Sequence, residues 1–146
     1  MTDYSHKNRN RGYRDLRVWH DAIAFYKLTV NEYRDFDGPL RRIHSQALAS
    51  ADSVHRNIAE GYCRRSVREY LNFINYALGS IGESVSGANA YLEAGQLGND
   101  SFARLDELAF KLENGLLRLR DSLSQQDPEE WSDHRMIKES NAIYDA

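Results

Sequence analysis

Few residues of this 146-residue chain have the types and spacing that catalysis or metal binding requires. Asp52 and His55 form one Asp-x-x-His pair, which on its own favours a surface hydrogen bond. His44 and His55 share a helix face but are separated by ~16 Å along the helix axis, too far to bind one metal ion. Cys63 is a single thiol without an adjacent base, so we interpret it as an incidental small residue.

The patterns of nucleotide and acyl-transfer chemistry are also missing. The sequence contains no Walker-type loop, no Gly-x-Gly-x-x-Gly and no Ser/His/Asp arrangement. It also lacks Glu-x-x-His, which di-iron helical bundles need on two helices. We therefore expect no catalytic residues, no metal site and no cofactor.

A polar set near the end of the second predicted helix is more informative. Asn57, Glu60 and Arg64 are spaced i, i+3 and i+7, so they share one helix face beside Gly61. The pattern predicts a hydrogen-bonded network at a helix corner or a subunit interface. Capping plus surface salt bridges, each worth under about 1 kcal/mol, is the plainer alternative. To the same interface or corner we assign three aromatic residues, Trp19, Tyr70 and Phe73.

Basic residues form a second candidate site. Residues 1–14 are predicted to form a flexible basic arm. Such arms contact nucleic-acid phosphates and stack on bases. They are also ordinary solubilising termini, and that alternative stays open. The candidate nucleic-acid-binding residues lie in this arm and on or after the second helix, and they are Lys7, Arg9, Arg11, Arg14, Arg56, Arg64, Arg65 and Arg68.

Charge is unevenly distributed although the formal net charge is only −3. Residues 1–73 hold 13 Lys and Arg against 9 Asp and Glu, whereas residues 74–146 hold 6 against 13. This asymmetry can indicate an anionic partner for the first half or attraction between subunits, and it can also have no functional meaning.

The elements that position these residues are four helices with heptad-like apolar spacing, at about 15–33, 40–62, 67–94 and 102–123. The third is about 28 residues long and begins with a capping box at Ser66 and Glu69. It contains Gly79, Gly82 and Gly87, for which close helix contact or a local kink is the expected reason. On the first helix the inward residues are expected to be Trp19, Ile23, Tyr26, Val30 and Tyr33.

Short connections and one apolar stripe per helix predict an all-α fold, an antiparallel up-down four-helix bundle over residues 15–123. A pair of long coiled-coil hairpins is the alternative. Residues 124–146 form an acidic tail, with a short extra helix predicted from Trp131 to Lys138. No apolar run approaches the ~20 residues of a membrane span. The polar start and single cysteine favour a cytoplasmic protein.

Further apolar residues widen the stripes of the first and third helices, including Val18, Phe25, Tyr76 and Tyr91. They fit either a thick core with tyrosine hydroxyls at its rim or a subunit interface.

Several motifs of the chain resemble those of a known family, the bacterial four-helix-bundle proteins first noticed in intervening sequences of large-subunit ribosomal RNA genes. The matching stretches are Asp15-Leu16-Arg17-Val18-Trp19, Ser45-Gln46, Asn57-Ile58-Ala59-Glu60-Gly61 with Arg64, Ser66-x-x-Glu69-Tyr70, Ala77-Leu78-Gly79-Ser80 and Leu97-Gly98. The resemblance covers residues 15–123. It implies a ring-like homopentamer of antiparallel bundles. One relative, the accessory variability protein of diversity-generating retroelements, is a basic pentamer that binds nucleic acid and a reverse transcriptase.

The chain departs from the family pattern at two places and in its overall charge. Ala47-Leu48-Ala49 stands where the family usually has an Arg-Arg pair, and Val54-His55-Arg56 stands where it tends to have Ile-Pro-Ser. The chain is also net negative and adds the acidic tail. We therefore keep two hypotheses. The first is a non-enzymatic homo-oligomer, a pentamer by resemblance, that binds RNA or DNA. The second is a scaffold that binds a protein partner.

Overall fold

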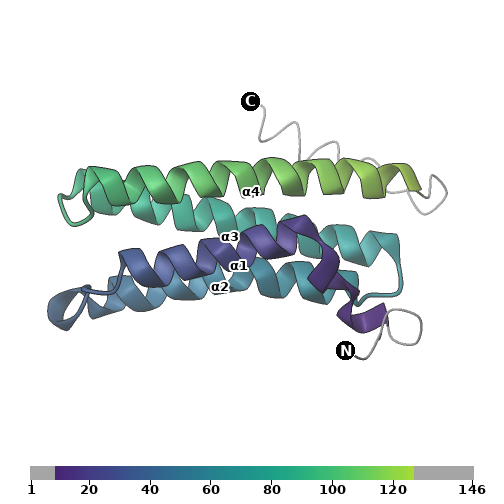
Figure 1. The fold of residues 1–146 in the computed structure, drawn as a ribbon, viewed down its shortest axis with the longest axis horizontal. Coiled ribbons are helices and arrows are strands. Elements are labelled where there is room, and N and C mark those ends of the chain that lie inside the picture. Colours follow the sequence, from purple (N-terminus) through teal and green to yellow (C-terminus); the bar gives the residue numbers. More distant parts are fainter. Residues whose placement is uncertain (1–8, 127–146) are drawn as a thin grey trace.

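The structure, a computed structural model, describes residues 9–126. The elements in chain order are the 3-10 helix η1 (Arg9–Asp15), α1 (Arg17–Glu32), the 3-10 helix η2 (Gly38–Leu40), α2 (Arg41–Tyr62), α3 (Val67–Glu93) and α4 (Asn99–Gln126). Figure 1 shows the four long helices side by side along one axis. Residues 9–126 contain no strand, so the predicted all-α class with four long helices is confirmed.

Each long helix packs against two others, since α1 and α3 both contact α2 and α4. The connections are short, at 33–40, 63–66 and 94–98, which is compatible with an up-and-down course. The largest fully buried side chains come from all four helices and are Phe25, Val54, Ile58, Leu71, Ile74, Ile81, Leu112 and Leu116. Between residues 9 and 126, no helix combines the length and apolarity that a membrane span requires.

Local signals explain where the helices begin and end. The backbone N–H of Glu69 donates to the hydroxyl of Ser66 at 3.1 Å, so Ser66 caps α3 as its sequence predicts. At the other end of α3, Gly95 takes a φ of 74°, a left-handed conformation that a residue without Cβ adopts at low cost. Pro39 lies in η2, the turn that leads directly into α2.

The buried face of α1 differs from the predicted one by a rotation of about one residue. The residues buried in the core are Val18, Ala22, Phe25, Thr29 and Tyr33, whereas Trp19, Ile23, Tyr26 and Val30 are only half-buried. Because Thr29 is polar, the apolar pattern of the sequence did not indicate that this face of α1 is the buried one. The hydroxyl of Thr29 donates to the carbonyl of Phe25 at 2.8 Å, so it is buried without an unsatisfied polar group.

The glycines of α3 also differ from the expectation. A Cβ built at Gly79 or Gly82 would meet nothing within 4 Å, and the three atoms nearest to one at Gly87 all belong to Tyr91 on the same helix, at 3.4–3.6 Å. Close contact with a helix of the same chain is therefore not the reason for these glycines. The close approach occurs instead at Gly61 of α2, where a Cβ would lie 2.8 Å from the Cβ of Phe73.

Part of the segment expected to be a flexible arm, residues 9–14, is helical instead. Residues 9–14 belong to η1, which packs against α1 and α2. The bundle also extends beyond its expected limit of 123, because α4 ends at Gln126. Residues 1–8, and the helix predicted from Trp131 to Lys138, lie outside the described residues.

Candidate nucleic-acid interface

Contacts between η1 and the last turn of α2 build one end of the bundle, on which the purple start of the described chain lies in Figure 1. The thiol of Cys63 donates to the carbonyl of Asn10 at 3.1 Å. The ring of Tyr13 lies 6.5 Å from the ring of Tyr62, edge to face. Gly12 is so close to Tyr62 that a Cβ there would lie 2.0 Å from its hydroxyl. The lack of a side chain at Gly12 therefore allows η1 to dock.

This docking brings two groups of predicted basic residues to the same end. Arg11 and Arg14 are exposed on η1, Arg64 and Arg65 are exposed in the turn between α2 and α3, and Arg68 is exposed in the first turn of α3. We call these five residues the basic end. They come from segments about fifty residues apart in sequence, and the Cys63–Asn10 contact joins the segments directly. Of the other predicted residues, Arg9 begins η1 and Lys7 lies outside the described residues.

Within the basic end, Arg64 is held by two neighbours. Its guanidinium donates to the carboxylate of Glu60 at 2.7 Å and lies 4.8 Å from the ring centroid of Phe73. Both partners of the ion pair are exposed, so the pair contributes under about 1 kcal/mol to stability. Its main consequence is orientation, because a guanidinium stacked on an aromatic ring still presents N–H groups to an oxyanion.

Arg56 lies outside this group. It is exposed on α2, eight residues before Arg64 and therefore ~12 Å away along the helix. Its guanidinium pairs with Asp52, whose other oxygen lies 2.7 Å from His55. The Asp52–His55 hydrogen bond agrees with its prediction from sequence. Burial raises the pKa of Asp52, but the hydrogen bonds to His55 and Arg56 outweigh it, so the pKa lies below its usual value.

The predicted network of Asn57, Glu60 and Arg64 is divided in two. Glu60 pairs with Arg64, as described, whereas the side chain of Asn57 donates to the carbonyl and hydroxyl of Ser53 at 2.8 and 2.9 Å. The hydroxyl of Ser53 in turn lies 2.9 Å from that of Ser80, so this half of the set joins α2 to α3. The sequence did not reveal this serine pair because both residues look like ordinary polar positions.

The three aromatic residues predicted for an interface are engaged within the chain. Trp19 packs on Tyr13 at 5.4 Å between ring centroids, and Tyr70 packs on Tyr62 at 6.1 Å. Burial, with a smaller contribution from Tyr62, raises the pKa of Tyr70 to about 12. Phe73 supports Arg64 on one side and the ring of Tyr76 on another, at 5.7 Å. Tyr76 itself is 60% exposed, and on α4 Phe110 is 66% exposed.

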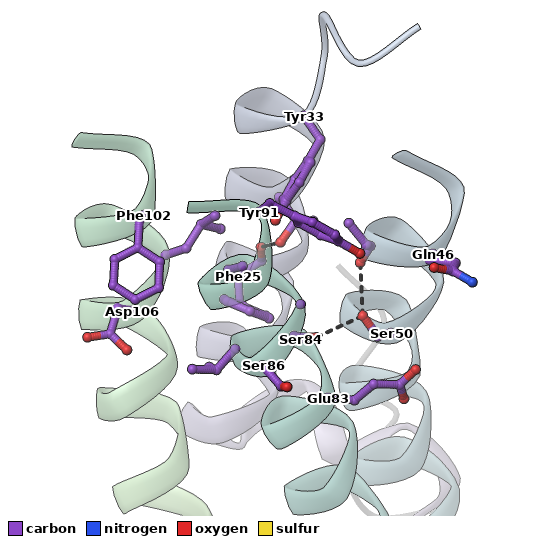
Figure 2. A pocket seen from close by; sticks show the side chains of 16 residues that line it. Phe25, Tyr33, Gln46, Ser50, Glu83, Ser84, Ser86, Tyr91, Phe102 and Asp106 are labelled. Carbon is purple, nitrogen blue, oxygen red and sulfur yellow. Dashed lines mark hydrogen bonds between the residues drawn. The ribbon is translucent and has the colours of Figure 1, made fainter. Parts of the chain in front are cut away.

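A cavity of about 280 Å³ lies toward the opposite end and was not predicted. It is lined by side chains of all four long helices, and Figure 2 shows Phe25, Tyr33, Tyr91 and Phe102 around it. One wall is held by a hydrogen bond from Ser84 to Ser50 at 3.0 Å. Small residues on α2 and α3 leave the space. The lining contains no Lys or Arg, so the cavity does not extend the basic end.

Metal ligands are not gathered anywhere in the described chain. Among residues 9–126, no three His, Cys, Asp or Glu side chains lie close enough together to hold a metal ion.

Taken together, these features define a class of protein, a bundle of four long helices with arginines from two segments at one end. The model of the 23S rRNA-intervening sequence protein family matches residues 14–118, so the chain belongs to that family, as its motifs indicated. A crystal structure of a protein of unknown function from the S23 ribosomal protein family, from Bacteroides thetaiotaomicron, is similar in fold. The TM-score is 0.58 at 20% identity, and the match covers 70% of this chain and 97% of that one. No curated protein matches the chain significantly.

Proposed function

We propose that the protein is a non-enzymatic bundle of antiparallel, up-and-down helices that forms a homo-oligomer and binds RNA or DNA through its basic end. The observation that carries the proposal is the docking of η1 beside the turn between α2 and α3, which gathers Arg11 and Arg14 with Arg64, Arg65 and Arg68. A pentamer is the assembly that the family resemblance implies.

The local arrangement outweighs the negative net charge of the chain. Phosphate binding depends on cations within reach of the backbone, because charges farther away than the Debye length of ~8–10 Å are screened. The five exposed arginines of the basic end outnumber the exposed carboxylates of the same segments, Asp15, Glu60 and Glu69, so they can neutralise phosphates despite the net charge of the chain. Each assembled copy would add another basic end, and this multiplies avidity where the sites engage one nucleic acid together.

The test is fluorescence anisotropy with labelled structured RNA and duplex DNA at ~50 and ~200 mM salt, since phosphate neutralisation makes the affinity fall steeply with salt. Replacing Arg14 and Arg65 with Gln should weaken binding at least tenfold at ~50 mM salt and reduce the salt slope by about 2. The matched control replaces Arg41 and Arg42, exposed at the other end of α2, with Gln. An equal loss in both variants, or no binding by the wild type, would remove the proposal.

The face of α3 that carries Tyr76 supports self-assembly. Tyr76 is 60% exposed. One to two turns further along α3, a Cβ added at Gly79 or Gly82 would meet no other atom within 4 Å. Another helix can approach closely at such a surface, and tyrosine is enriched at interfaces. Light scattering at micromolar concentration should show an oligomer, and Tyr76→Arg should reduce its mass. A wild-type protein that stays monomeric would contradict this part of the proposal.

A protein-binding scaffold is the second candidate, and the exposed Phe110 favours it. Its ring is 66% exposed on α4, beside the exposed carboxylates of Asp106 and Glu107. An apolar anchor with an acidic surround fits a basic protein partner better than a nucleic acid. Absence of RNA and DNA binding at low salt, together with a pull-down lost in Phe110→Ala, would establish this candidate in place of the first.

A further inference from the structure

The end of α4 lies at the same end of the bundle as the basic residues. A Cβ built at Gly115, three turns before the helix ends, would lie 2.9 Å from a methyl group of Val18 in the first turn of α1. The last turns of α4 therefore run beyond the start of α1, and Figure 1 shows the end of α4 and the purple start of the described chain at the same end of the bundle. Gln126, the last described residue, therefore lies at the same end of the bundle as the basic end.

The sequence that follows is strongly acidic. Residues 127–146 hold six carboxylates and two cations (Arg135 and Lys138), a formal charge of −4. Three of the carboxylates, Asp127, Glu129 and Glu130, fall within the first four residues. Residues 1–126 hold 17 Lys and Arg against 16 Asp and Glu, a formal charge of +1. The sign of the net charge is thus set by this segment, which we call the acidic segment.

We propose that the acidic segment docks on the basic end of its own chain and competes there with nucleic-acid phosphate. The inference rests on the proposed function for its consequence, but docking itself requires only the opposite charges and their positions. Twenty residues reach up to ~65 Å when extended, and neighbouring helix axes lie ~10 Å apart, so the whole basic end is within range. Tethering also gives the segment an effective concentration of order millimolar.

The chemistry of the two partners matches. Carboxylates accept bidentate hydrogen bonds from guanidinium groups in the same geometry as phosphate oxygens. Trp131, next to the first acidic cluster, can also stack on a guanidinium that is already exposed, such as that of Arg65. A nucleic acid with many phosphates displaces such a segment only by replacing these contacts. Docking of the acidic segment therefore lowers the apparent affinity for nucleic acid. Long or structured targets are favoured, because they offer many phosphates.

The experiment compares full-length proteins. The test variant replaces Asp127 and Asp133 with Asn and Glu129 and Glu130 with Gln, which keeps the length and Trp131. The matched control makes the same number of neutral replacements at exposed positions toward the opposite end, in Asp35, Asp37, Glu93 and Asp100. The control isolates docking from a general change in net charge, because both variants gain four units of positive charge.

The first readout is independent of nucleic acid. Hydrogen exchange, followed by mass spectrometry, should be slower at residues 9–15 and 63–68 in the wild type and the control than in the test variant. The difference should disappear at high salt, because it depends on screened charges. Equal exchange in all three proteins would overturn the proposal. Protection that appears only as protein concentration rises would also overturn it, since the acidic segment would then dock on another copy.

The second readout is affinity for structured RNA. The test variant should bind about tenfold more tightly than the wild type at ~50 mM salt, with a smaller gain at ~200 mM. The control should gain no more than about twofold. An equally large increase in the RNA affinity of the control would overturn the proposed competition at the basic end. If no protein binds RNA, the proposed function fails, and the exchange experiment still decides whether the segment docks.

Discussion

Replacing Gly61 with Ala should destabilise the protein, although alanine is the better helix former. Gly61 is buried in the last turn of α2, where that helix crosses the start of α3. An added Cβ would lie 2.8 Å from the Cβ of Phe73, 3.0 Å from the ring of Tyr70 and 3.2 Å from the carbonyl oxygen of Tyr70. The Cβ and the carbonyl oxygen belong to the main-chain framework of α3, so a change of rotamer cannot relieve the contact.

Two opposing effects set the size of the change. Glycine to alanine in a helix stabilises by about 1 kcal/mol. Overpacking costs about 1–3 kcal/mol, and contact with the Cβ and the carbonyl oxygen of α3 places the cost here in the upper part of that range, at about 2–3 kcal/mol. We expect a net loss of about 1–2 kcal/mol in the free energy of unfolding. With an m-value of ~2 kcal/mol/M, typical of a domain of this size, the urea midpoint should fall by about 0.5–1 M.

Gly79→Ala is the matched control, since a Cβ there meets nothing within 4 Å. It should raise the stability of a single chain by up to about 1 kcal/mol. Urea unfolding, followed by circular dichroism, is measured at two protein concentrations, because an effect that grows with concentration reports assembly instead. Equal or greater stability of Gly61→Ala relative to the wild type would refute the close approach of α2 and α3 at this corner.

Three further predictions concern caps and ionisable groups. Ser66→Ala should cost about 1 kcal/mol in urea unfolding, and Ser66→Asp should restore most of it, because Ser66 caps α3. The hydrogen bond from Arg104 lowers the pKa of Glu32, so the stability advantage of wild type over Glu32→Gln should be present at neutral pH and vanish as the pH falls below about 4. Burial raises the pKa of Tyr70 to about 12, so wild-type stability should decline above pH ~10, less so in Tyr70→Phe, as alkaline unfolding curves would show.

The elements of the fold could be predicted because their signals are local. The hydroxyl of Ser66 and the backbone N–H of Glu69 are three residues apart, and Gly95 lies two residues after the end of α3, so the limits of that helix can be predicted from neighbouring residues. The buried face of α1 could not be chosen in the same way. Both of its faces carry large apolar residues, and the correct one includes Thr29, whose hydroxyl is satisfied only once the helix has formed.

The candidate site was predicted in its residue types but not in its arrangement. Arginines on both sides of Gly12 and a second group after Tyr62 are visible in the sequence, but their shared location depends on a contact between residues fifty positions apart. Similarly, the spacing of Asn57, Glu60 and Arg64 correctly indicates a shared helix face. It does not indicate that Ser53 is a nearer partner for Asn57 than Glu60 is.

The dependence of the basic end on η1 also constrains how the proposed nucleic-acid binding can change. Arg11 and Arg14 join the arginines of the α2–α3 turn only while Gly12 packs under the ring of Tyr62. Any side chain at Gly12 would alter the arrangement of the cations without changing their number. Under the proposed function, net charge and arginine count are therefore poor guides to the nucleic-acid affinity of variants of this chain. The better guide is whether position 12 still lacks a side chain and faces the ring of Tyr62 at the end of α2.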